Sequence, residues 1–357
     1  MKAIIAALSA LAACSPTSAA TSFGSGEPPA SASGTATTTS ASTTNAESTS
    51  TGDPGSTSGS AGISSAAVPD LGTMPDLGSP LPAGCEGKKI DFLFVISNSN
   101  TMEIKQERLL AAFPGFMDAI EAKDIDKHIL VTTSLPLWHM SDCADCISDC
   151  DKNGSPTQCG AELTACDSML GAAYTFPAGK GATNRRCTLA GGTPYITSKE
   201  VQVDSAFKCL ATVGLDGSNY YDADAVRAAI SPAMNAGGAC NDGFLRKDAL
   251  LVITIIADTM DEDSLDDPED WAADVLAAKG GDPDAAYLLV ITTDIDIPGH
   301  LCWPDQVALD EEGRLRTWAK LTPNASVQSI CAEDYVPFFE DALSTILELC
   351  ESFVPPG

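Results

Sequence analysis

Positively charged residues are scarce in this chain of 357 residues. It holds 20 Lys and Arg against 49 Asp and Glu, so its net charge is −29. A surface this acidic repels the phosphates of nucleic acids and the anionic head groups of lipids. We therefore expect no nucleic-acid partner. The charge indicates either a well-hydrated soluble exterior or an attraction for cations and basic surfaces.

Histidine is also rare, and the motifs of common enzymes are missing. The three His residues are His128, which begins a predicted strand at the edge of the core, and His139 and His300, which have no recognisable nucleophile as a partner. The region after residue 84 contains neither the Gly-x-Ser-x-Gly turn of hydrolases nor the His-Glu-x-x-His zinc motif. Gly179-Lys180 lacks the upstream glycine of a phosphate-binding loop. We predict that the chain has no catalytic residues and is not an enzyme.

The apolar segment at the N-terminus is too short to span a membrane. Residues 1–14 carry a single charge at Lys2 and end in Leu-Ala-Ala-Cys14. Small residues before a Cys resemble a bacterial lipoprotein signal, in which Cys14 is acylated and becomes the new N-terminus. The alternative is an ordinary secretory signal cleaved near Ala19 or Ala20. We predict an exported protein that is lipid-anchored through Cys14, in the outer membrane of a Gram-negative bacterium.

Lys and Arg are absent from residues 15–84, which consist mainly of Ser, Thr, Ala, Gly and Pro. Such a segment cannot bury enough apolar surface to offset the entropy of ordering its backbone. We predict a disordered tether between the lipid anchor and a folded domain at 85–357.

Cysteine, by contrast, is plentiful. Of the 13 Cys residues, 12 remain once Cys14 is set aside, and an even number in an exported chain indicates disulfides of undetermined pairing. Residues 134–191 hold six of them without regular periodicity, and this predicts a disulfide-rich insertion. The spacing of Cys143, Cys146 and Cys150 near His139 also suits zinc, although export favours disulfides. The predicted disulfide residues are Cys85, Cys143, Cys146, Cys150, Cys159, Cys166, Cys187, Cys209, Cys240, Cys302, Cys331 and Cys350.

Apolar segments typical of buried strands alternate with segments of helical periodicity. This alternation predicts a doubly wound α/β fold, with a mostly parallel sheet covered by helices on both faces. We expect a break or kink of the first helix at Pro114. The predicted strands are 90–96, 128–133, 250–256, 286–292 and an edge strand at 326–330; the predicted helices are 103–122, 198–213, 223–230, 271–278, 315–321 and 335–353.

The first strand ends in Ser97-Asn98-Ser99-Asn100-Thr101, a cluster of small side chains that carry oxygen atoms. Strand and cluster together resemble the first strand and metal loop of the von Willebrand factor type A (vWA) family. That family has an Asp-x-Ser-x-Ser motif here, and Ser97 stands at the position of its Asp. Segments 113–120, 243–251 and 329–339 are similar to those of secreted bacterial lipoproteins with this domain. The resemblance implies a vWA/Rossmann-like fold over most of residues 88–355.

The resemblance also implies a degenerate metal-ion-dependent adhesion site. Its ligands would come from three loops: Ser97, Ser99 and Thr101 in the first, Ser218 in the second and Asp258 in the third. The implied ion is Mg²⁺, or Mn²⁺ or Ca²⁺ in its place, because such hard cations bind oxygen ligands. The alternative is that Ser97–Thr101 only turns the chain and caps the next helix. The acidic run 261–267 is predicted to be a solvated loop, with Ca²⁺ binding as its alternative.

By resemblance, we expect a cell-envelope lipoprotein that presents a vWA-like module for protein–protein binding or surface adhesion. A carboxylate of the unidentified protein partner would complete the coordination of the ion. The alternative is a structural or scaffolding envelope lipoprotein that works without metal.

Overall fold

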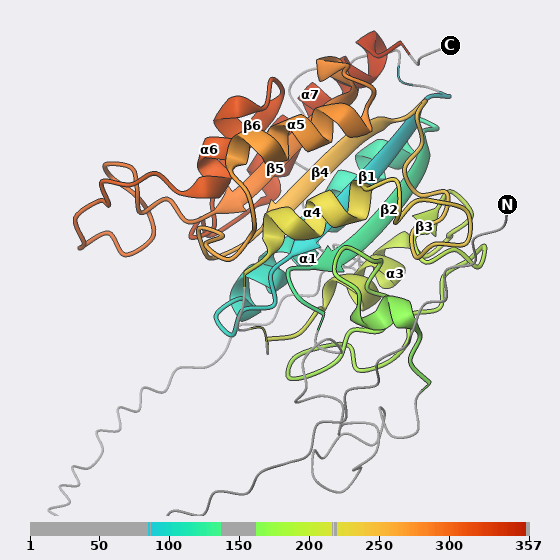
Figure 1. The fold of residues 1–357 in the computed structure, drawn as a ribbon, viewed down its shortest axis with the longest axis horizontal. Coiled ribbons are helices and arrows are strands. Elements are labelled where there is room, and N and C mark those ends of the chain that lie inside the picture. The colour runs from blue at the N-terminus through green and yellow to red at the C-terminus, as the bar shows by residue number, and fades with distance from the viewer. Residues whose placement is uncertain (1–84, 86, 137–161, 216, 218–219, 355–357) are drawn as a thin grey trace, which may run out of the picture. The chain divides into compact units, whose positions relative to one another are not determined.

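A computed structural model describes residues 85, 87–136, 162–215, 217 and 220–354 of the chain (Figure 1). All of them belong to one unit, Met74–Gly357. Three of the predictions concern residues outside the described ranges: the signal 1–14 with Cys14, the tether 15–84 and the ligand Ser218. None of the helices in this part of the chain combines the length and the apolar character that a membrane span requires.

The centre of the domain is a six-stranded sheet with the order β3-β2-β1-β4-β5-β6. Five strands are parallel, and only β3, which has two residues, runs antiparallel beside β2 at one edge. The predicted mostly parallel α/β fold is therefore confirmed, and the predicted edge strand is β6. The strands are β1 (Lys89–Ile96), β2 (Asp126–Thr133), β3 (Ile196–Thr197), β4 (Leu250–Ile256), β5 (Ala286–Thr292) and β6 (Ala325–Ser329).

Helices pack against both faces of this sheet because its central strands are apolar on both sides. In β1, Phe92 and Phe94 belong to one buried cluster, whereas Leu93 and Val95 belong to the other. The first cluster contains side chains of α1 (Glu103–Glu121), α3 (Val203–Ala211) and α7 (Val336–Ser352). The second contains side chains of α4 (Asp222–Ile230), α5 (Pro268–Ala278) and α6 (Arg314–Leu321). Figure 1 shows α4 and α5 in front of the sheet.

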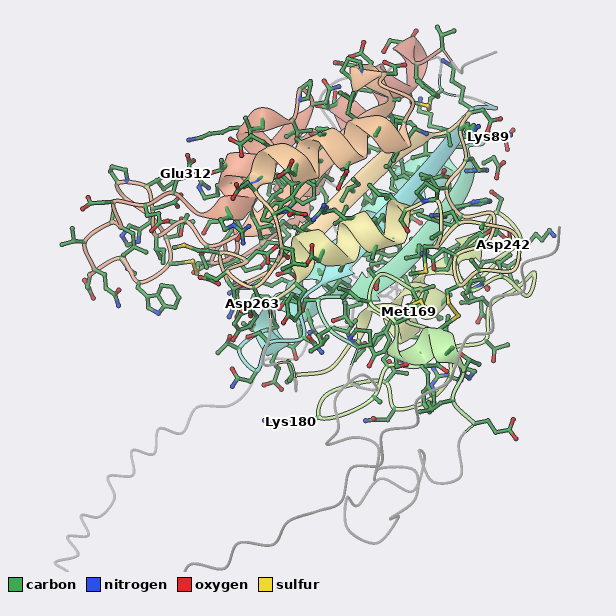
Figure 2. All side chains as sticks on the ribbon, in the orientation of Figure 1. Lys89, Met169, Lys180, Asp242, Asp263 and Glu312 are labelled. Atoms are coloured by element: carbon green, nitrogen blue, oxygen red, sulfur yellow. A yellow bond between two sulfur atoms is a disulfide. The ribbon has the colours of Figure 1, made fainter. Side chains whose placement is uncertain are left out.

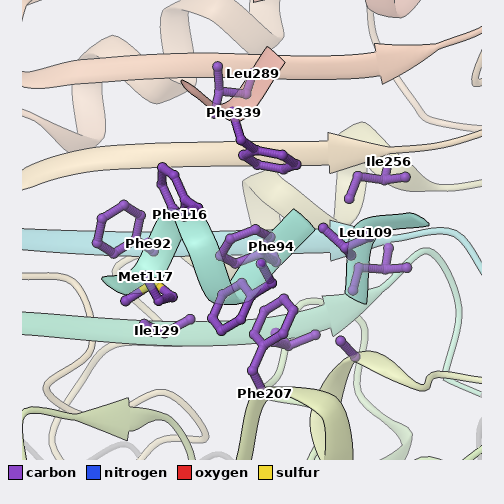
Figure 3. Close-up of a cluster of buried hydrophobic side chains, with 14 of the residues drawn as sticks. Phe92, Phe94, Leu109, Phe116, Met117, Ile129, Phe207, Ile256, Leu289 and Phe339 are labelled. Carbon is purple, nitrogen blue, oxygen red and sulfur yellow. The ribbon is translucent and has the colours of Figure 1, made fainter. Parts of the chain in front are cut away.

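The first cluster is rich in aromatic rings (Figure 3). Phe94 of β1 contacts Phe207 of α3 edge to face, with ring centroids 4.9 Å apart, and Phe116 of α1 contacts Phe339 of α7 at 5.3 Å. Helix α1 continues through Pro114, so the predicted break is absent. Its buried positions keep a helical spacing on both sides of the proline, and this packing holds the helix together.

The described part of the predicted insertion is more closely joined to the domain than expected. Two of its cysteines form disulfides with cysteines outside residues 134–191: Cys166 is bonded to Cys240, and Cys187 is bonded to Cys209. Tyr174 is buried and its backbone N–H donates to the carbonyl of Val131 in β2. Residues 162–191 are therefore part of the core packing rather than a separate subdomain. Two further disulfides join Cys85 to Cys350 and Cys302 to Cys331; Cys143, Cys146, Cys150 and Cys159 lie outside the described residues.

A buried carboxylate, Asp91, is held by an arginine near the amino end of β1. The Arg246 side chain donates through Nε to Asp91 Oδ1 at 2.7 Å, and its backbone N–H donates to Oδ2, also at 2.7 Å. Arg246 also binds Asp126 Oδ2 at 2.7 Å. Burial raises the pKa of Asp91 from 3.8 to about 6, although the charge and hydrogen bonds of Arg246 oppose the rise.

We predict that Arg246→Met lowers the free energy of unfolding by about 3–5 kcal/mol at pH 8, because the buried Asp91 carboxylate loses the guanidinium that binds it. The folded pKa of Asp91 lies above its ordinary value, so the native state binds an extra proton between about pH 4 and 6. At pH 5 more of the Asp91 carboxyl is protonated and uncharged. Removal of the guanidinium therefore lowers the free energy of unfolding by less at pH 5 than at pH 8. Urea unfolding at both pH values measures this difference.

The matched control is Lys247→Met, which removes an exposed cation next in the chain. It changes the free energy of unfolding by less than about 0.5 kcal/mol. Equal losses for the two variants, or a loss for Arg246→Met that does not depend on pH, would contradict the prediction.

Candidate functional site

The first loop of the site follows β1 and is tied to the strands on both sides. The backbone N–H of Ser97 donates to the carbonyl of Ile256 in β4 at 2.9 Å. On the other side, the amide of the buried Asn98 donates to the carbonyl of Leu135, just past β2, at 2.8 Å. These bonds hold the loop at the carboxyl edge of the sheet, where ligands of open parallel sheets bind.

The hydroxyls of this loop meet the carboxylate that follows β4. Ser99 Oγ and Thr101 Oγ1 lie 3.0 Å apart, and Thr101 Oγ1 donates a short hydrogen bond to Asp258 Oδ2. Lys105 Nζ lies 3.4 Å from the same oxygen. The other oxygen, Asp258 Oδ1, is buried and has no hydrogen-bond partner. The structure therefore brings Ser99, Thr101 and Asp258 together.

The second loop reaches the site through Gly217. Its N–H donates to the carbonyl of Asn98 at 2.8 Å, and Gly217 forms a parallel bridge with Ser99. A Cβ atom on Gly217 would lie 2.3 Å from Asn98 Oδ1, so the approach requires glycine. The predicted ligand Ser218 is next in the chain but lies outside the described residues.

Ser97 differs from its two partners in the predicted ligand set. Its side chain is fully buried, and Ser97 Oγ accepts the N–H of Ser99 at 3.3 Å, as in a local turn. The alternative role as a cap of the next helix is not seen, because α1 begins after Met102 without a hydrogen bond from a capping side chain. The loop side chains bind each other, the neighbouring strands and Asp258 instead.

Two buried carboxylates near this edge, Asp222 and Asp261, were not predicted from the sequence. Asp261 was predicted to lie in a solvated acidic run, but it is fully buried. Asp261 Oδ2 accepts the N–H of Ala223 at 2.7 Å and the hydroxyl of Ser264 at 2.9 Å. Burial raises the pKa of Asp261 to about 6. Asp261 is buried because it caps α4, a contact between segments far apart in the chain.

Asp222 is the first residue of α4 and has no exposed surface. Neither of its carboxylate oxygens has a hydrogen-bond partner. Burial raises the pKa of Asp222 well above its ordinary value, and the negative charges of Asp261, Asp258 and Glu262 raise it further. In the sequence, an Asp at a helix start indicates only a cap, so no local signal could have identified this residue.

The residues of this edge suit a hard cation only if hydroxyl and carboxylate oxygens act together. No three His, Cys, Asp or Glu side chains among the described residues are grouped so that they alone could hold a metal ion. The hydroxyls of Ser99 and Thr101 next to the unpartnered Asp258 Oδ1 supply the oxygen donors that Mg²⁺ or Ca²⁺ binds.

No family model matches the chain, and no curated protein matches it. Among solved structures, two crystal forms of proximal thread matrix protein 1 from the mussel byssus are similar at 9% identity, with TM-scores of 0.36 and 0.34. They cover 76% and 74% of this chain and 48% and 47% of that protein. The D319A mutant of the PilB minor pilin from Streptococcus sanguinis is similar at 8% identity, with a TM-score of 0.33, over 74% of this chain and 62% of the pilin. The chain thus spans about half of the mussel protein and less than two thirds of the pilin.

We predict that Gly217→Ala lowers the free energy of unfolding by about 1–3 kcal/mol, because the added methyl group forces the second loop away from Asn98. Urea unfolding measures the loss. Gly237→Ala is the matched control, since a Cβ there meets no atom within 4 Å. If Gly217→Ala is as stable as the control, the two loops are not in contact as described.

Proposed function

We propose that the protein is an exported lipoprotein whose folded domain binds a protein partner at the carboxyl edge of a doubly wound, vWA-like sheet. The strand order and the helices on both faces support this form of the α/β fold. The motif resemblance at residues 97–101 supports binding at that edge. Binding rather than catalysis is the proposed role, because the hydroxyls and carboxylates of this edge are the oxygen ligands that a hard cation prefers.

The proposed cation is Mg²⁺, or Mn²⁺ or Ca²⁺, held by Ser99, Thr101 and Asp258 with Ser218 as a further ligand. When bound, the ion would supply positive charge to a carboxylate of the partner. The proposal depends on one observation. The hydroxyls of Ser99 and Thr101 in the first loop lie beside Asp258 in the third, whose buried Oδ1 has no hydrogen-bond partner. Without a cation, that oxygen is a buried acceptor with no compensation.

An exposed apolar loop beside this edge supports a protein as the partner. Leu301, Trp303 and Val307 lie between β5 and α6 and are 57%, 54% and 91% exposed. The loop is held in place, because Cys302 is bonded to Cys331 and Asp294 accepts the N–H groups of Leu301 and Cys302. Aromatic and apolar side chains on a rigid frame are typical of the residues that contribute most to protein binding.

The apolar loop lies next to the third loop of the site. Thr292 Oγ1, at the end of β5, donates to the carbonyl of Thr259 at 2.9 Å, and Gly313 at the other end of the loop lies against Met260. Figure 2 shows Asp263 and Glu312 at this end of the molecule, with Lys89 at the opposite end. A partner on the edge would therefore meet the apolar loop as well as the ion.

The proposed location is the cell envelope, with the chain anchored through Cys14 in the outer membrane and the domain carried on the tether. The four disulfides among the described residues support an oxidising compartment, where such bonds persist. The alternative is a structural envelope lipoprotein that needs no metal. The two functions differ in whether partner binding depends on a divalent cation.

We predict that the purified protein captures a partner from envelope extracts in Mg²⁺ or Mn²⁺ and releases it in a chelator. Asp258→Ala abolishes capture because the ion loses a ligand, and Trp303→Ser weakens the affinity about 30-fold because an exposed anchor is lost. Surface plasmon resonance with the captured partner measures both effects.

Val201→Ser is the control for the apolar loop. Val201 is 91% exposed, and its neighbour Glu200 lines a surface pocket with Gly87 and Asp126 at the amino end of the strands. This variant should bind as the wild type does. Capture that survives both the chelator and Asp258→Ala would instead favour the metal-independent structural role.

A further inference from the structure

Among the described residues, the buried oxygen atoms that have no hydrogen-bond partner include four on the α4 side of the carboxyl edge of the sheet. They are both carboxylate oxygens of Asp222, Oδ1 of Asp258 and Oγ1 of Thr132. These residues come from three separate elements: α4, the loop after β4, and β2. A buried polar atom without a partner costs about 1–3 kcal/mol, and more when it is charged. Such a group of acceptors is unfavourable unless something positive or hydrogen-bonding binds it.

The three elements meet on one side of the sheet. Thr132 lies two positions after Leu130 in β2, so both side chains face the same side. Leu130 belongs to the buried cluster that also contains Val226 of α4 and Ala257, the residue before Asp258. Helix α4 packs on β1 and β2 there. The negative charge of Asp258 also acts on Asp222.

Asp222 does not serve as a helix cap. The N–H of Ala223 donates to Asp261 Oδ2 at 2.7 Å, and the N–H of Asp224 donates to Ser264 Oγ at 3.1 Å. The third loop of the site therefore already caps the first turn of α4. The Asp222 carboxylate is left without the donors that an acidic residue at a helix start ordinarily accepts.

We propose that the Asp222 carboxylate is a ligand of the cation at this edge and supplies, with Asp258, the negative charge that binds it. The inference rests on the proposed cation site and adds a residue to it. Residues 97–101 contain no acidic side chain, so the first loop supplies no negative charge. Two carboxylates balance a divalent ion, and the hydroxyls of Ser99 and Thr101 complete a set of oxygen ligands that a hard cation prefers.

Lys105 does not take the place of this ion. Its ammonium group lies 3.4 Å from Asp258 Oδ2 and also donates to the carbonyl of Thr101, whereas the unpartnered atom is Oδ1. Lys105 therefore leaves one oxygen of Asp258 and both oxygens of Asp222 available.

The test is calorimetric titration of the full chain with MgCl₂, MnCl₂ and CaCl₂, comparing the wild type with Asp222→Asn. Asn keeps the shape of the side chain and removes its charge. We expect the variant to bind the preferred ion at least about tenfold more weakly. In a second measurement, the ion at about 100 times the Kd of the wild type raises the Tm of the wild type more than that of the variant.

In a chelator, Asp222→Asn should unfold at a Tm equal to or above that of the wild type, because a buried charge is gone. This shows that the variant folds, and Asp222→Ser serves as a second neutral replacement. If both variants are unfolded in a chelator, the carboxylate maintains the fold instead of binding an ion, and the proposal is wrong.

Glu262→Gln is the matched control. Glu262 is an exposed residue of the third loop whose charge also acts on Asp222, so its removal changes the local field without removing the proposed ligand. We expect its ion affinity to stay within about twofold of the wild type. A loss as large as that of Asp222→Asn would indicate a general field effect and overturn ligation by Asp222.

The remaining outcomes separate this inference from the proposed function. If the wild type and Asp222→Asn bind an ion equally, Asp222 is not a ligand and the cation site of Ser99, Thr101 and Asp258 stands. If the wild type binds none of the three ions below millimolar concentration, both proposals fall.

Discussion

The burial of β1 on both faces is the constraint on which the rest of the domain depends. Residues 92–96 have no exposed surface, and they pack alternately into two separate clusters. A strand of this kind is stable only between two other strands and beneath helices on both sides. Because β1 pairs with β2 and β4, the loop after Ile96 must lie between the ends of both neighbours. The position of the candidate site is thus a consequence of hydrophobic packing.

Two buried aspartates, Asp91 and Asp222, differ in the groups that surround their carboxylates. Asp91 is compensated by the guanidinium and backbone N–H of Arg246. Asp222 is equally buried and lacks any hydrogen-bond donor. A buried carboxylate needs a cation or donors in the low dielectric of a protein interior. A positive charge bound next to Asp222, at the carboxyl edge of the sheet, would therefore stabilise the fold.

Several predictions from local pattern agree closely with the structure. The segments 250–256 and 286–292 are β4 and β5, because a run of Val, Ile and Leu between polar turns suits a strand buried on both faces. Strand β3 was not predicted, since two residues carry no periodicity. Helix α3 begins at Val203 rather than at Ser198. Helix α1 continues through Pro114 because it packs against β1 and α7. The low helix propensity of proline takes no account of such tertiary contacts.

The sequence by itself determined the alternation of strands and helices, the place of the oxygen-rich loop 97–101 and the excess of acidic charge, because these depend on neighbouring residues and composition. Only the tertiary structure decided which cysteines pair, that Asp261 caps α4, and that Asp222 is buried without a partner. The physical reason is that desolvation and hydrogen bonding depend on atoms brought together from distant positions. Thr132, Asp222 and Asp258 are separated by 90 and 36 residues along the chain, and only folding brings their elements to one side of the sheet.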